Sequence, residues 1–328
     1  MLHETAMQRL ARGIAGMALA ALFAPGPTAA QDYPAQPVRI LVTAAPGGIG
    51  DILARMFSQK LGETNNAIVV VENRTGGAGV IATDAVAKAQ PDGYLLLMGT
   101  QGSVAVRPHL VKLPYDPQKD LAPIVLLVSV PNILVVHPSV PAKSIKELIG
   151  YAQANPGKLS YASQGVGSSG HIAGELFKRA TGLDIVHVPY RGAAPAAQDL
   201  AAGHVSMMFD VVSLALAPIK AGAVRALGVA AKARAAVLPE VPTMAEQGLP
   251  IELGAWFGLL APAGTPPAVI AWLNREANRA FSTADAKVKF VAQGADMPLG
   301  TPEDFAKFIA ASSGQFGEVI RRAGIKVE

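Results

Sequence analysis

Two glycine-rich loops, each lying between an apolar run and an amphipathic stretch, constrain the fold of this chain most. The loops are Ala45-Pro46-Gly47-Gly48-Ile49-Gly50-Asp51 and Ser163-Gln164-Gly165-Val166-Gly167-Ser168-Ser169-Gly170-His171. The apolar runs at 38–42 and 159–162 are typical of strands, and helical spacing follows each loop. A strand, a glycine turn and a helix in this order indicate a parallel α/β fold. A helix start also exposes unpaired N–H groups and the positive end of the helix dipole, which favour an anion.

The same alternation continues along the chain and predicts α/β architecture, with mostly parallel sheets flanked by helices. The expected strands are 38–42, 68–71, 94–98, 159–162, 185–188, 205–209 and 226–229. The expected helices are 52–61, 81–89, 144–154, 172–181, 194–202, 213–221, 267–281 and 303–323. The apolar stretch 121–136 is interrupted by Pro123, Pro131 and Asn132 and predicts two buried strands. Ser144 and Glu147 predict a capping box.

Two apolar stretches, 125–136 and 255–261, are interpreted as crossings between two domains. Residues 31–131 and 256–328 would then form domain 1, and residues 132–255 would form domain 2. Such a discontinuous arrangement predicts a ligand cleft at the boundary, near the carboxyl ends of strands.

Residues 1–30 have the features of a cleaved signal peptide. Arg9 and Arg12 precede an apolar run at 14–23, and small residues before Gln31 allow cleavage near Ala30. The run is shorter than a membrane span requires, although an N-terminal anchor is the alternative. The chain has no cysteine, so the exported protein would have neither disulfides nor a lipidated cysteine. We expect a soluble periplasmic protein.

Composition and spacing exclude several function classes. A net charge of +4 without a basic run interleaved with aromatics argues against nucleic acid. The histidines show no metal-ligand spacing, so no metal is expected. Residues 165–170 match G-x-G-x-x-G, and Asp184 lies where a ribose-binding acid would be. The export signal disfavours that dinucleotide site, so no cofactor is expected.

The loops themselves supply the candidate ligand contacts. Glycines in the first loop would let the backbone approach an acid, while Asp51 caps the following helix or faces the ligand. Hydroxyl groups in the second loop would donate beside the backbone N–H groups. Gln101 and Asp210 follow strands, and Asp210 is equally consistent with a helix cap. The full set is Gly47, Gly48, Gly50, Asp51, Gln101, Ser163, Gly165, Gly167, Ser168, Ser169, His171 and Asp210.

No catalytic residue is predicted. Ser168 and Ser169 have no convincing base and acid partners, and the nucleophile-elbow pattern is absent from this loop. Arg191 is the best cationic candidate near the site, although a structural arginine is the simpler interpretation. Two alternatives to a transport receptor stay open: a sensory module that presents its ligand to a receptor kinase, and an exported serine hydrolase.

From about Tyr33 onward the chain resembles the Bug (Bordetella uptake gene) family, the solute-binding receptors of tripartite tricarboxylate transporters. The matching motifs are Pro46-Gly47-Gly48-x-x-Asp51-x-x-Ala54-Arg55, Val71-Glu72-Asn73-Arg74, Pro91-Asp92-Gly93-Tyr94, Leu113-Pro114-Tyr115-Asp116-Pro117, Val130-Pro131-Asn132, Gly165-x-Gly167-Ser168-Ser169-x-His171, Val188-Pro189-Tyr190-Arg191-Gly192, Phe209-Asp210 and Trp256-Phe257-Gly258-Leu259-Leu260-Ala261-Pro262. Their order and spacing across the chain make the match specific.

The resemblance implies a two-domain type II periplasmic binding fold, a "Venus flytrap" with two crossover strands as its hinge. It also implies a carboxylate held by both loops, mostly through backbone N–H and hydroxyl groups, and delivery to membrane permease subunits. A cleft complete within one chain makes a monomer the default. Family members usually carry an aromatic residue before the first loop, whereas this chain has Thr43-Ala44-Ala45. The smaller residues predict either a roomier pocket or a looser cover over it.

Overall fold

The computed structural model describes residues 33–325. The predicted signal peptide and its cleavage site lie outside the described residues. The chain divides after Ala35, and a single compact unit begins at Gln36. This second unit contains both glycine loops and all the strands discussed below.

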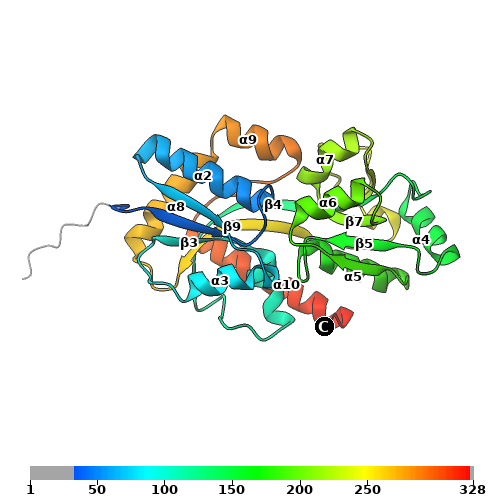
Figure 1. Ribbon diagram of the computed structural model, residues 1–328, viewed down its shortest axis with the longest axis horizontal. Helices are drawn as coiled ribbons and strands as arrows, with labels where there is room; N and C mark the ends of the chain where they lie inside the picture. Colours follow the sequence, from blue (N-terminus) through cyan, green and yellow to red (C-terminus); the bar gives the residue numbers. More distant parts are fainter. Residues whose placement is uncertain (1–32, 326–328) are drawn as a thin grey trace, which may run out of the picture. The chain divides into compact units, whose positions relative to one another are not determined.

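One sheet is formed by strands from the beginning and the end of this unit (Figure 1). Its order is β2 (Val69–Asn73), β1 (Val38–Val42), β3 (Leu95–Thr100), β9 (Gly254–Pro262) and β4 (Leu121–Val136). The first three strands are parallel, and β9 runs antiparallel to both β3 and β4. We call this sheet A.

The middle of the chain forms a second sheet, sheet B. Here β4 pairs with β7 (Met207–Val211) and β8 (Arg225–Ala230), and β7 continues to β5 (Ser160–Ser163) and β6 (Val186–Pro189). Strand β5 is parallel to β6 and β7, whereas β4 is antiparallel to β7 and β8. Both sheets therefore combine parallel strands with an antiparallel strand that comes from the crossing region.

Strand β4 belongs to both sheets. Residues up to Pro131 pair with β9, and Asn132–Val136 pair with β7 and β8. The prediction of two separate strands was wrong, because the prolines do not interrupt the ladder. Pro123 lies at a register shift, and bulges are where a strand tolerates proline. Pro131 faces Gly254, where a methyl group would collide with the carbonyl of Val130.

The helices follow the predicted alternation, and the two that follow the glycine loops begin three residues earlier than predicted. They are α2 (Ile49–Asn65), α3 (Val80–Ala87), α4 (Ile145–Ala154), α5 (Ser169–Thr181), α6 (Ala193–Ala201), α7 (Val212–Lys220), α8 (Pro267–Phe281), α9 (Ala284–Phe290) and α10 (Pro302–Ala323). In Figure 1, α2 and α8 lie on one side of sheet A, and α3 and α10 lie on the other. Among the described helices, none combines the length and apolarity that crossing a membrane requires.

Two local expectations need correction. Ser144 does cap α4 by accepting the N–H of Glu147, but the Glu147 carboxylate accepts from Lys143 rather than from Ser144. The capping box is therefore displaced by one residue. Helix α9 was not predicted. It has only seven residues, and its N-cap, Thr283, lies just two residues after the end of α8.

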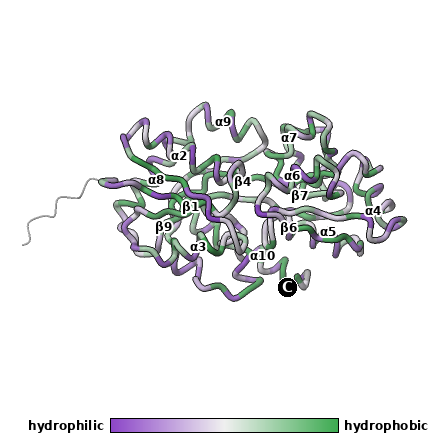
Figure 2. Tube along the Cα trace, in the orientation of Figure 1, coloured by the Kyte–Doolittle hydropathy of each residue, from purple (hydrophilic) through white to green (hydrophobic). Residues whose placement is uncertain are grey.

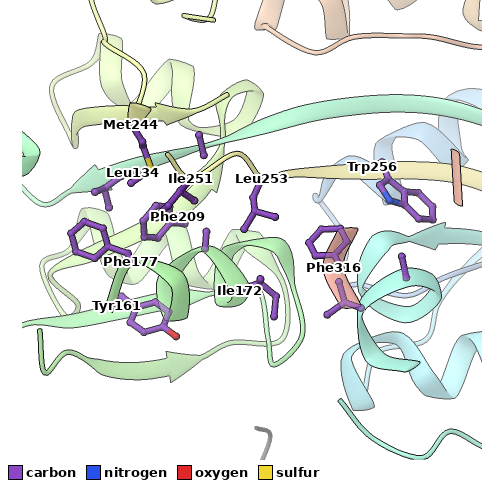
Figure 3. Close-up of a cluster of buried hydrophobic side chains, with 14 of the residues drawn as sticks. Leu134, Tyr161, Ile172, Phe177, Phe209, Met244, Ile251, Leu253, Trp256 and Phe316 are labelled. Atoms are coloured by element: carbon purple, nitrogen blue, oxygen red, sulfur yellow. The ribbon is translucent and has the colours of Figure 1, made fainter. Parts of the chain in front are cut away.

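The hydrophobic core lies between the sheets and their helices. Figure 3 shows Phe177 of α5 beside Phe209 of β7, close to Leu134 of β4. In Figure 2 the outer helices α2 and α9 alternate between hydrophobic and hydrophilic residues, as helices with one buried face do. Ile49, Leu53 and Phe57 of α2 are buried as well, so packing fixes the starts of α2 and α5 relative to their sheets.

Candidate functional site

A cavity of about 740 Å³ lies between elements of sheet A and elements of sheet B. The first glycine loop contributes Gly48, Ile49 and Gly50, and the second contributes Gly165, Val166, Ser168 and Ser169. Gln101, Arg107, Arg191, Asp210 and Phe257 also line it. The cavity thus brings together the starts of α2 and α5, which are far apart in sequence.

In the first loop, Gly48 is the N-cap of α2. The N–H groups of Ile49 and Gly50 donate to no partner within residues 33–325. Asp51 instead accepts the Gly47 N–H at 3.0 Å and pairs with Arg55 at 3.0 Å. Burial opposes the ionisation of Asp51, but the hydrogen bonds from Arg55 and Gly47 hold its pKa below the usual value. Gly47 and Asp51 therefore shape the loop and do not line the cavity.

The three glycines of this loop are needed for different reasons. Gly47 has φ +88°, in the left-handed region. A methyl group on Gly50 would lie 3.4 Å from Phe257 and 3.5 Å from Met98, so this glycine allows close packing. A methyl group on Gly48 would have only the Ala45 carbonyl nearby, at 3.8 Å. Of the three, Gly48 combines ordinary φ with a lining position and open space.

The second loop satisfies many of its own polar groups. Gly165 N donates to Ser163 Oγ at 3.2 Å, Gly167 N to His171 Nδ1 at 3.1 Å, and His171 N to Ser168 Oγ at 3.2 Å. The N–H groups of Ser169 and Gly170, in the first turn of α5, have no partner among the described residues. Ser163, Gly167 and His171 do not line the cavity, so they support the loop from behind.

A stack of rings holds this support in place. The ring of His187 lies 4.4 Å from that of His171 and 4.7 Å from that of Tyr161. Its Nε2 is 2.7 Å from Ser163 Oγ. Burial, and then the neighbouring His171, lower the pKa of His187 to about 4. Burial also lowers the pKa of His171. Both imidazoles are therefore neutral at pH 7, which lets Nδ1 of His171 accept from the loop.

Asp210 lies at the end of β7 and is 3% exposed. Its Oδ1 accepts from Val211 N at 2.8 Å and Gln164 Nε2 at 3.4 Å, whereas Oδ2 accepts from no described residue. Burial raises its pKa to about 6 despite these two hydrogen bonds. On the side of the cavity formed by sheet A, Gln101 Oε1 accepts from Trp256 N at 3.1 Å, which fixes the Gln101 amide at the cavity wall. Both residues can therefore contact a bound molecule.

Two arginines line the cavity, and sequence reasoning missed one of them. Arg191 is exposed, as its position before Gly192 suggested. Arg107 begins η4 (Arg107–His109), directly after the π-helical turn η3 (Gly102–Val106). This irregular segment has no periodicity that would show which side chain faces the cavity. Its only signal was a lone basic residue after the apolar sequence 104–106.

Among the described residues, neither serine that lines the cavity has a histidine ring or an acid as the hydrogen-bond partner of its hydroxyl, and the Ser163–His187 pair lies behind the loop. The hydroxyl of Ser169 has no hydrogen-bond partner among the described residues, and Nδ1 of His171 already accepts from Gly167. Within residues 33–325, no group of three or more histidine and acidic side chains is close enough to hold a metal ion. The cavity lining presents N–H donors with no described partner, several hydroxyl groups, two amides, two cations and one acid. The donors and cations outnumber the acid, which suits an anionic ligand.

A family model described as "Tripartite tricarboxylate transporter family receptor" matches residues 52–325. The chain belongs to this receptor family. Among curated relatives, BugT of Bordetella pertussis is 36% identical over 96% of this chain and 98% of its own length. A protein of Pseudomonas sp. strain P51, described as the UPF0065 protein in the tcbD-tcbE intergenic region, is 40% identical over 94% and 93%. The resemblance to Bug proteins is confirmed.

Several solved structures have the same fold as this chain. Rpa4515 of R. palustris with adipate has a TM-score of 0.85 at 36% identity, covering 90% of this chain and 99% of its own. MatC of Rhodopseudomonas palustris with bound malate has a TM-score of 0.84 at 33% identity, covering 88% and 100%. The periplasmic binding protein BugD has a TM-score of 0.85 at 34% identity, covering 90% of this chain and 100% of its own, so the predicted two-domain periplasmic binding fold is confirmed.

Proposed function

We propose that this protein is a periplasmic receptor that captures a small organic acid in the cavity between the two glycine loops. It would then deliver the acid to the permease subunits of a tripartite tricarboxylate transporter. One observation carries the proposal: the starts of α2 and α5, both with unpaired N–H groups, line the same cavity. The adipate and malate in two related structures support a carboxylate as the ligand.

The available interactions are sufficient for useful affinity. Each helix N-terminus contributes about 0.3–1 kcal/mol toward an anion, and up to ~2 kcal/mol when partly buried. Each charge-assisted hydrogen bond contributes roughly 1.5–3 kcal/mol. After the cost of association, micromolar binding at about −8 kcal/mol is within reach.

We further propose that the ligand stabilises a closed arrangement of two bodies, residues 31–131 with 256–328 and residues 132–255. The change of pairing partners on β4 between Pro131 and Asn132 supports a hinge at this point. Only a ligand that contacts both bodies would favour closure. The cavity lining, drawn from both glycine loops, meets that condition.

A thermal-shift screen of the mature protein against carboxylates tests the proposal directly. Binding to the native state raises the apparent melting temperature by mass action. Adipate, L-malate, succinate and benzoate form a suitable first panel, with calorimetry on each positive result. Recovery of unchanged ligand distinguishes a receptor from a hydrolase. The proposal fails if no small acid binds, or if the protein converts the acid that it binds.

Ser169→Ala provides a graded check of the loop's role. We expect a 3- to 10-fold weaker affinity, because the substitution removes one hydrogen bond, worth ~1 kcal/mol, and leaves the backbone N–H donors in place. Calorimetry on the best acid of the panel measures the change. A complete loss of binding would instead assign Ser169 an organising role in the loop.

A further inference from the structure

Arg107 is a partly buried cation whose charge is not balanced by an acid of the described chain. Its Nη1 donates to the carbonyl of Val166 at 3.3 Å, and its Nε is buried without a partner within residues 33–325. A carbonyl oxygen offsets a guanidinium only in part. A buried donor that stays unpaired costs free energy, so the site gains when a ligand supplies the missing acceptor.

The groups near Arg107 do not supply the missing negative charge. Burial lowers its pKa, and the nearby Tyr115 is neutral at pH 7, because burial raises the pKa of that phenol to about 12. His171 behind the loop is neutral as well. Asp210 is the one acid among the described residues that line the cavity, and its hydrogen bonds go to Val211 and Gln164. A ligand carboxylate is therefore the counter-charge that this cavity lacks.

Arg107 also connects the two sides of the cavity. It follows β3 of sheet A through η3, whereas Val166 belongs to the loop after β5 of sheet B. A methyl group on Gly167 would lie 3.1 Å from Cγ of Arg107, so the arginine stem packs closely on that loop. An anion bound to the guanidinium would therefore be held by a residue that contacts both sides of the cavity.

We infer that Arg107 is the residue that makes this site prefer a carboxylate over its neutral amide. This inference rests on the proposed function and assigns a specificity-determining role within that same cavity. Backbone N–H and hydroxyl groups can bind the oxygen of an acid or of an amide, whereas a guanidinium gains its full interaction only with a charged partner. Exposed Arg191, which donates to no described residue, is the competing candidate for this role.

The test compares each acid with its amide. Adipate, L-malate and benzoate are titrated by calorimetry beside adipamide, malamide and benzamide, using wild type, Arg107→Gln, Arg107→Lys and Arg191→Gln. For Arg107→Gln we expect the affinity for the acid to fall 10- to 100-fold and that for the amide to change less than 3-fold. Arg107→Lys should recover part of the preference, since the charge returns without the planar fork.

The outcomes separate this inference from the function on which it rests. If wild type binds no acid, the proposed function has failed. If wild type binds an acid and Arg107→Gln lowers the affinity for the acid and for the amide equally, Arg107 is only structural and the inference is overturned. The inference is also overturned if Arg191→Gln abolishes the preference for the acid over its amide while Arg107→Gln retains that preference. Melting temperatures without ligand show that each variant is folded, and higher salt should reduce the acid preference of wild type.

Discussion

Replacing Gly48 with valine should abolish acid binding while leaving the protein folded. The backbone at Gly48 has φ −78°, which valine accepts, and a new Cβ meets no atom closer than 3.8 Å. The added side chain would project beside the unpaired N–H groups of α2 and block the approach of a carboxylate. We expect a loss of affinity greater than 100-fold, measured by calorimetry, for an acid that wild type binds.

The stability cost of this substitution should be small. Valine is a poorer N-cap than glycine, by about 1 kcal/mol, so the melting temperature should fall by roughly 2–4 °C. Gly150→Val is the matched control, since Gly150 is an exposed helical glycine with open space around it. Unchanged affinity in Gly48→Val would overturn the assignment of the α2 start as a ligand contact.

Asp210→Asn should change how stability depends on pH. The pKa of Asp210 is about 6 in the folded protein, against ~3.9 in an unfolded chain. Between these values the folded state holds the proton more often, so the contribution of Asp210 to stability is complete below pH ~4 and is lost as the pH rises to ~6. The difference corresponds to about 3 kcal/mol. Asparagine cannot ionise, so the variant should gain stability relative to wild type across this window.

His187 should produce the opposite trend over nearly the same range. Its pKa is about 4 in the folded protein, against ~6.5 when unfolded, so its contribution is complete above pH ~6.5 and is lost as the pH falls to ~4. In wild type these two groups offset each other. Denaturant unfolding at pH 4 to 7.5 measures this. The free energy of unfolding should rise more steeply with pH in Asp210→Asn than in wild type, and it should fall with pH in His187→Gln. Parallel curves for wild type and Asp210→Asn would contradict the burial argument.

The sequence predicted the regular elements well, because strands and helices have periodic signals. It also predicted both glycine loops as the starts of α2 and α5. Strand β4 was misread since proline was treated as a break, whereas the partner strand accommodates it through register shifts and a glycine. These features belong to the pairing with β9, about 120 residues away in the sequence, so no local sequence pattern could predict them.

The candidate site was predictable only in outline. Seven of the predicted residues line the cavity: Gly48, Gly50, Gln101, Gly165, Ser168, Ser169 and Asp210. The others, such as Asp51 and His171, occupy loop N–H groups that we had assigned to the ligand. A spacing motif cannot tell whether a donor faces outward or is used by its own loop. His187 and Arg107 were missed because their roles arise only when separate segments meet.

The passage of β4 from sheet A to sheet B has a consequence for folding cooperativity. Backbone pairing continues along β4 from one sheet into the other, so neither sheet has its full set of strands until β4 is in place. Loss of β4 from one sheet removes its pairing with β9, and loss from the other removes its pairing with β7 and β8. Residues 36–325 should therefore melt as one calorimetric unit, and a fragment cut at residue 131 should not fold alone.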